Sequence, residues 1–200
     1  MVRRILVFAA FSFGLFASVE ANAQSFTAGT VVAQVGVQTG GNYGLHYYTS
    51  ATFGKSFAID LGLPTIFDDG TVGLGFYYAN KSFNQTKQYA FNNSYYFDRT
   101  WDYDVYGARF TYHYDFFGVK AMDTYVGLMA SYNHVEFSYK DTYYDANPDA
   151  PGNPYPLHFN NTVRSSAFAG IRYEFIEHVA AFAEVGLGNY NLFGGVCYRY

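Results

Sequence analysis

Residues 192–200 read LFGGVCYRY, and this stretch decides the fold class of the chain. One set of alternate positions is apolar or aromatic apart from one glycine, and the other set mixes small residues with a charge. The first set is Leu192, Gly194, Val196, Tyr198 and Tyr200, and the second is Phe193, Gly195, Cys197 and Arg199. A period of two is the pattern of a half-buried β-strand.

The same alternation returns in residues 106–116, 163–175 and 181–188. A soluble β-sandwich also alternates, but its solvated face carries Lys, Glu, Thr and Gln freely, and glycine weakens a strand. Here the polar face combines glycine with isolated charges, which suits a narrow closed interior. The opposite face, apolar with Tyr and Phe at its ends, suits a lipid-facing band with aromatic girdles.

The composition excludes several other classes. Aromatic residues make up 22% of the 200 residues and charged residues only 14%, whereas disordered chains are poor in aromatics and rich in charge. Cys197 is the one cysteine, so a disulfide scaffold is excluded. Twelve basic residues against 16 acidic ones leave no basic surface for nucleic acid, and no nucleic-acid partner is predicted.

The first residues predict an export signal over 1–23. Arg3 and Arg4 precede the apolar run 5–17, and Ala21-Asn22-Ala23 offers small residues for cleavage after Ala23. The alternative, a transmembrane anchor, needs about 20 apolar residues, and this run stops well short of that. The remaining residues, 24–200, are predicted to form one outer-membrane β-barrel domain.

Eight strands are expected, with short and long connections in alternation, as in bacterial outer-membrane barrels. The long connections are 40–54, 84–101 and 140–161, and Pro64 makes the second strand the least regular. The expected strands are 28–39, 55–66, 71–83, 102–116, 123–139, 162–175, 179–189 and 192–200. The sequence therefore predicts an all-β protein, an eight-stranded antiparallel up-and-down transmembrane β-barrel.

Three stretches resemble the end of small bacterial outer-membrane proteins: FAGIRYEF at 168–175, AFAEVGLG at 181–188 and NLFGGVCYRY at 191–200. The resemblance is to the outer membrane protein beta-barrel domain, or porin family, related in architecture to the OmpX and OmpA barrels. Residues 26–37 resemble its first strand and 68–78 its second hairpin. The resemblance implies that Val196, Tyr198 and Tyr200 form the signal read by the barrel-assembly machinery, although the usual last residue is Phe.

The inward-facing charges are the main candidate site. An eight-stranded barrel has an interior that side chains fill, and opposite charges there must pair because an unpaired one costs several kcal/mol. We therefore expect a luminal polar network of salt bridges rather than a selectivity ring, since solute diffusion calls for about 16 strands. The expected members are Asp60, Arg109, Asp115, Arg164, Arg172, Glu174, Glu184 and Arg199.

No catalytic, cofactor or metal site is predicted. The pairs His113 with Asp115 and His134 with Glu136 share strand faces, but zinc requires three or four ligands. Lipid A deacylases use a His-x-Ser pair, and no histidine here has a serine two residues later. No dinucleotide or P-loop motif is present.

The predicted function is therefore non-enzymatic: membrane integrity, with surface recognition or adhesion through extracellular loops. Residues 84–101 and 140–161 are rich in Tyr, Asn and Asp, which suits protein or glycan ligands. Outer-membrane lipids, lipopolysaccharide and the barrel-assembly machinery are the other expected partners. The alternatives left open are a small passive channel, a lipid A-modifying enzyme and a soluble lipocalin-like binder.

Overall fold

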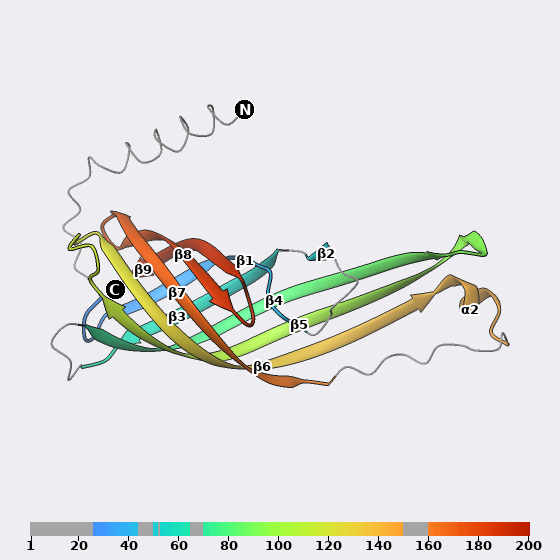
Figure 1. Ribbon diagram of the computed structural model, residues 1–200, viewed down its shortest axis with the longest axis horizontal. Coiled ribbons are helices and arrows are strands. Elements are labelled where there is room, and N and C mark those ends of the chain that lie inside the picture. The colour runs from blue at the N-terminus through green and yellow to red at the C-terminus, as the bar shows by residue number, and fades with distance from the viewer. Residues whose placement is uncertain (1–25, 44–49, 52, 65–69, 150–159) are drawn as a thin grey trace, which may run out of the picture.

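A computed structural model describes residues 26–43, 50–51, 53–64, 70–149 and 160–200 (Figure 1). The predicted export signal lies outside these residues, as do parts of the connections 40–54, 67–70 and 140–161. The strands are β1 (Val31–Thr39), β2 (Ser50–Ala51), β3 (Gly54–Gly62), β4 (Thr71–Tyr89), β5 (Asn92–Tyr114), β6 (Met122–Asp141), β7 (Thr162–Ile176), β8 (Val179–Leu187) and β9 (Leu192–Arg199), and the short helix α2 (Thr142–Ala146) follows β6.

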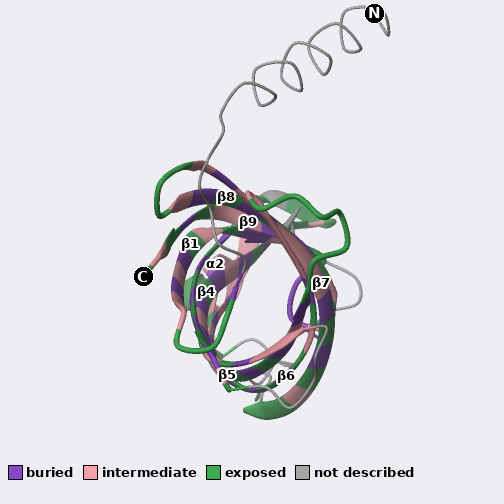
Figure 2. Cartoon of the chain, turned by 90° about the vertical axis from the view of Figure 1, so that its left-hand side faces the viewer, coloured by how far each residue is buried: buried purple, intermediate pink, exposed green. Residues whose placement is uncertain are grey.

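Eight of these strands close into a ring in the order β1-β3-β4-β5-β6-β7-β8-β9 (Figure 2). Every pairing is antiparallel between neighbours, and β1 joins β9 to complete the ring. The predicted eight-stranded antiparallel up-and-down barrel is thus confirmed. The two-residue strand β2 lies outside the ring and pairs with β4, Ser50 opposite Asn84.

The barrel has two unlike ends (Figure 1). At one end, here the turn end, lie Phe26, the chain terminus Tyr200 and the short connections after β5 and β7. Tyr200 exchanges two backbone hydrogen bonds with Val31 there. At the other end, here the loop end, β4, β5 and β6 run on far beyond the remaining strands.

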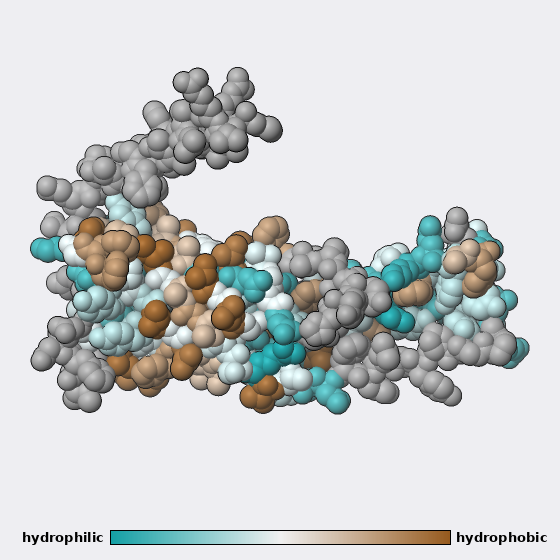
Figure 3. Space-filling model, in the orientation of Figure 1, coloured by the Kyte–Doolittle hydropathy of each residue, from teal (hydrophilic) through white to brown (hydrophobic). Residues whose placement is uncertain are grey.

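The barrel is inside out, as the alternation predicted. Arg109 is 1% exposed and faces the interior, whereas Leu128 on the outer face is 63% exposed. Arg172 and Glu184 are likewise buried, while Phe110 and Val185 point outward. On the face of the barrel that Figure 3 shows, many of the outward side chains are hydrophobic. The interior is narrow at the β1–β9 seam, where a Cβ on Gly36 would lie 2.1 Å from the carbonyl oxygen of Gly194, so only glycine fits.

The prediction of a loop at 84–101 is wrong. β4 and β5 stay paired from Thr71 opposite His113 to Gln88 opposite Tyr96, and β6 follows β5 as far as Asp141. Interstrand hydrogen bonds do not require an apolar face, so the ladder continues where the residues turn polar. Strand ends also differ: β3 stops at Gly62 before Pro64, β5 ends at Tyr114, and β8 ends at Leu187.

We call residues 80–104 and 134–146 the extension: the outer parts of β4, β5 and β6 together with α2. Beyond Asn133 opposite Thr162, β6 has no ladder to β7, so β4, β5 and β6 continue as an open sheet that projects from the loop end (Figure 1). Among the residues described, no helix combines the length and the apolar content needed to cross a membrane.

Candidate functional site

The centre of the lumen is built around Arg109 of β5. Its Nη2 lies 2.8 Å from Oε1 of Glu184 on β8, and its Nε lies 3.2 Å from Oδ1 of Asp60 on β3. Tyr125 donates a 2.8 Å hydrogen bond to the same Glu184 carboxylate, and Tyr190 donates to its other oxygen. Side chains from separate strands of the ring thus meet at the centre of the lumen and fill it.

A second arginine links this centre to the turn end. Arg172 of β7 contacts Oδ2 of Asp60 at 2.7 Å and Oδ2 of Asp123 at 2.8 Å. Its guanidinium lies 4.3 Å from the centroid of the Tyr125 ring. Asp60 therefore bridges the two arginines, and this run of ion pairs satisfies charges that would be costly to bury alone.

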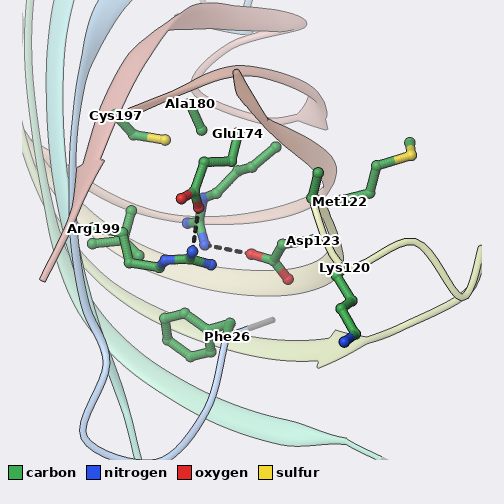
Figure 4. Close-up of a pocket in the computed structure, with 11 residues that line it drawn as sticks. Phe26, Lys120, Met122, Asp123, Glu174, Ala180, Cys197 and Arg199 are labelled. Carbon is green, nitrogen blue, oxygen red and sulfur yellow. Dashed lines mark hydrogen bonds and ion pairs between the residues drawn. The ribbon is translucent and has the colours of Figure 1, made fainter. Parts of the chain in front are cut away.

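At the turn end, a small pocket lies between Phe26 and these charges (Figure 4). Arg199 forms an ion pair with Glu174, and Arg172 reaches Asp123 on the other side of the pocket. The ring of Phe26 is buried and stacks on His113 with centroids 3.7 Å apart. Phe26 thus covers the central network at the turn end.

Two residues of the predicted luminal network lie elsewhere. Asp115 is exposed in the turn after β5, where its carboxylate accepts a hydrogen bond from the backbone N–H of Gly118, because the strand ends one residue earlier. Arg164 has the inward position but sits at the loop end, where its Nη1 donates to the carbonyl of Asn42. The other six, Asp60, Arg109, Arg172, Glu174, Glu184 and Arg199, are brought together as described.

Sequence reasoning missed several luminal residues. One is Asp123, whose carboxylate lies 2.8 Å from Nδ1 of His113, a histidine already expected on the inward face of its strand. Asp123 is the second residue of β6, and its inward position on the alternation was the available signal. Tyr190 gave no such signal, because it lies in the β8–β9 connection and folds back into the lumen.

Thr111, His113 and Asp123 form a hydroxyl–imidazole–carboxylate chain that resembles a hydrolase triad in its contacts. Nε2 of His113 lies 2.9 Å from Oγ1 of Thr111, and Nδ1 faces Asp123. Thr111 is 0% exposed and Phe26 stacks over the imidazole, so no substrate reaches the hydroxyl in this structure. In the described part of the chain, no three His, Cys, Asp or Glu side chains are grouped to hold a metal ion.

On the outer face of β4, β5 and β6, apolar residues give way to polar ones within one row of the ladder. We call Tyr78, Tyr106 and Tyr132, which are register partners, the tyrosine row. The next row toward the loop end is Asn80, Asp104 and His134, and the one after it is Ser82, Asp102 and Glu136. Figure 3 shows the hydrophilic band that follows the hydrophobic barrel surface.

On the inner face, the order is the reverse. Past the charged centre, the inward positions are mostly aromatic or aliphatic, and most of them are buried. The apolar ones packed together there are Phe83, Trp101, Tyr103, Val135 and Phe137. Among them lies Lys81, 1% exposed, whose Nζ donates to the carbonyl of Gly40 and lies 5.0 Å from the centroid of Phe83. Burial lowers the pKa of this lysine.

At the far end of the extension, Asp141 fastens α2 to the sheet. Its carboxylate accepts hydrogen bonds from the hydroxyls of Tyr89 and Tyr139 and from the backbone N–H groups of Tyr143 and Tyr144, the cap of α2. Burial raises the pKa of Asp141, but these four hydrogen bonds outweigh it and leave the pKa below its ordinary value. Burial and the nearby carboxylate raise the pKa of Tyr89 to about 12.

Aromatic rings gather where the β4–β5 hairpin meets α2. We call Tyr89, Phe91, Tyr95 and Tyr143 the aromatic tip. The Phe91 and Tyr143 centroids are 5.2 Å apart and those of Tyr95 and Tyr143 are 5.3 Å apart, both in edge-to-face geometry. Phe91 at the hairpin apex is 64% exposed.

No protein-family model matches the chain, and no curated protein sequence does. Two similar solved structures are both of Ail, the attachment invasion locus protein of Yersinia pestis, one of them in complex with the heparin analogue sucrose octasulfate. Each is 11% identical over 87% of this chain and 100% of that chain, with TM-scores of 0.48 and 0.46. At these values the likeness carries no argument about function.

Proposed function

We propose that this chain spans a bacterial outer membrane as a non-enzymatic barrel with a filled lumen, and that its extension serves surface recognition outside the cell. The observation that carries the proposal is the change at the tyrosine row. On its barrel side the outer positions are apolar, including Leu74, Phe110 and Leu128, and on its other side they are polar. An aromatic row between the two is typical of a membrane interface.

The apolar band has a suitable height. On β5 it extends from Tyr106 to Tyr114. Eight steps of about 3.3 Å along a strand tilted by about 40° give roughly 20 Å, close to the ~25 Å band of outer-membrane barrels. Aromatic residues also border the apolar band at the turn end, among them Tyr114, Tyr198 and Tyr200.

The filled lumen supports a structural role over a passive channel. Arg109, Asp60 and Glu184 meet across the axis, and Phe26 covers the network at the turn end. Purified barrel in a planar bilayer should therefore give no stable ion steps, and regular steps would favour the channel. Release or transfer of acyl chains from added lipopolysaccharide would instead favour the lipid A-modifying enzyme.

Insertion remains part of the proposal. Val196 and Tyr198 are exposed on the outer face of β9, and Tyr200 follows that strand. This is the surface that the barrel-assembly machinery would read. Lipopolysaccharide would surround the part of the apolar band that lies next to the tyrosine row. Export through cleavage after Ala23 and a contribution to membrane integrity complete the proposal.

The recognition role is tested by removing the hairpin. Asn84 lies opposite Thr100, so residues 85–99 can be replaced by a two-residue Asn-Gly turn that suits an antiparallel pair. Bacteria that display this variant should no longer adhere to cultured cell layers. The folded state of the variant barrel is checked by its gel mobility, which should still change on heating as that of the unaltered chain does. Unchanged adherence with an intact barrel would contradict the proposal.

A further inference from the structure

We infer that the aromatic tip is a binding site for uncharged carbohydrate, an inference that rests on the proposed recognition role of the extension. The apolar C–H face of a sugar ring stacks on an aromatic face, and its hydroxyls need nearby acceptors. The tip offers the rings of Phe91, Tyr95 and Tyr143, each at least partly exposed, and α2, which carries Tyr143, also carries the exposed carboxylate of Asp145.

The kinds of side chain at the tip favour sugar over lipid. The segments 87–99 and 138–149 contain no Leu, Ile, Val or Met, the residues that supply most apolar area in membrane-inserting surfaces. Tyrosine instead offers a rigid ring together with a hydroxyl, at a small cost in conformational entropy. Asp145 is exposed and forms no hydrogen bond or ion pair with the residues that the structure describes, so its oxygens are available to hydroxyl donors.

Charge disfavours an acidic ligand such as a sulfated glycan. Asp145 on α2 and Asp149 after the helix are both exposed. Segments 87–99 and 138–149 together carry three basic residues, Lys87, Arg99 and Lys140, and four acidic ones, Asp98, Asp141, Asp145 and Asp149. Arg99 also lies 4.8 Å from the centroid of Phe97 and 5.7 Å from that of Tyr139. The tip therefore has no net positive charge that would attract a polyanion.

The tip is also held in place before any ligand arrives. Thr142 exchanges hydrogen bonds with the backbone N–H and C=O of Tyr96, at 2.8 and 2.9 Å, and Asp141 holds the first turn of α2. Tyr143 on the helix is thus fixed against Phe91 and Tyr95 on the hairpin. A preorganised ring surface loses little entropy on binding.

The experiment uses the full chain in phospholipid nanodiscs, titrated calorimetrically with chitohexaose, maltohexaose and a heparin hexasaccharide. We expect saturable binding of at least one uncharged hexasaccharide and no competition by the heparin fragment. Phe91→Ala and Tyr143→Ala should each weaken binding about tenfold or more, the loss of one to two stacking contacts. Tyr143→Phe should retain binding, because the ring remains.

Phe53→Ala is the matched control, because Phe53 is another strongly exposed phenylalanine but precedes β3, outside the tip. It should bind as the unaltered chain does. Binding of neither uncharged hexasaccharide, or heparin binding that survives Phe91→Ala, overturns the inference. If adherence depends on residues 85–99 while both uncharged sugars fail to bind, the recognition role stands and only the carbohydrate assignment falls.

Discussion

The barrel and the extension share three strands but assign their faces in opposite ways. Within the barrel, β5 turns Arg109 inward and Phe110 outward; within the extension, it turns Trp101 inward and Asp102 outward. The strand geometry is the same in both parts, since the ladder from Tyr114 to Phe97 runs without a shift in register. The medium on each face, and not strand propensity, therefore decides which residue type each position takes.

The largest expected effect comes from removing a charge inside the barrel. Arg109→Met should lower the free energy of unfolding by about 3–5 kcal/mol, because it leaves Glu184 buried without its cation. Urea titration in lipid vesicles, followed by Trp101 fluorescence, measures the change. The double variant with Glu184→Met should recover part of the loss. Arg164→Met is the control, since among the described residues Arg164 binds only oxygen atoms of neutral groups at the loop end; an equal loss there would contradict the argument.

The next effect tests the outer faces directly. Leu128 and Ser138 both point outward on β6. Leu128 lies on the barrel side of the tyrosine row and Ser138 lies on its extension side. Leu128→Arg should destabilise the inserted barrel by about 2–4 kcal/mol, the cost of a cation on a lipid-facing strand. Ser138→Arg should change stability by less than about 0.5 kcal/mol. Both are read from urea titrations in lipid vesicles, and similar values for the two would place the membrane boundary elsewhere.

The same contrast explains what the sequence could predict. Alternation is strongest where one face meets lipid and the other a packed lumen, so residues 106–114 and 181–187 were placed correctly. Beyond the tyrosine row the outer face becomes hydrophilic, and residues 84–101 looked like a loop. A signal was present nonetheless, because Tyr95, Phe97 and Trp101 keep the inward positions.

The candidate site was predictable in part. Strand position alone turned Arg109, Arg172 and Glu184 inward. Their partners depend on which strands face each other across the ring, as Asp60 on β3 faces Arg172 on β7, and spacing along the chain does not contain that information. The joining of α2 to the hairpin through Asp141 likewise arises from contacts between segments distant in sequence.

A smaller effect is expected in the extension, where Asp141 holds α2. Because the pKa of Asp141 is lowered in the folded state, its contribution is fully present above its unfolded pKa of about 4 and is lost as the pH falls through the folded pKa. Amide hydrogen exchange at Tyr143 and Tyr144 should therefore be constant from pH 7 to about pH 5, after correction for intrinsic rates, and lose protection below about pH 4. Asp141→Asn should remove this pH dependence and cost about 1 kcal/mol of local stability, with the barrel amides as internal control. Protection that persists unchanged at pH 3 would contradict the role of Asp141 and show that the Thr142–Tyr96 hydrogen bonds and the rings are enough to hold α2.

The smallest effect concerns Lys81, the buried lysine of the extension. Lys81 lies between rings at the start of the extension, and among the described residues no carboxylate pairs with it; its Nζ donates to one backbone carbonyl. Arg109, by contrast, has two carboxylates. Lys81→Met shortens the unbranched side chain by one heavy atom and removes a charge whose burial is opposed by desolvation. It leaves one carbonyl to bind water at the loop end. The free energy of unfolding should therefore change by no more than about 1 kcal/mol, in either direction, in the same urea titration as Arg109→Met. A loss as large as that of Arg109→Met would mean that Lys81 neutralises a carboxylate after all, and that the inner face of the extension follows the rules of the lumen.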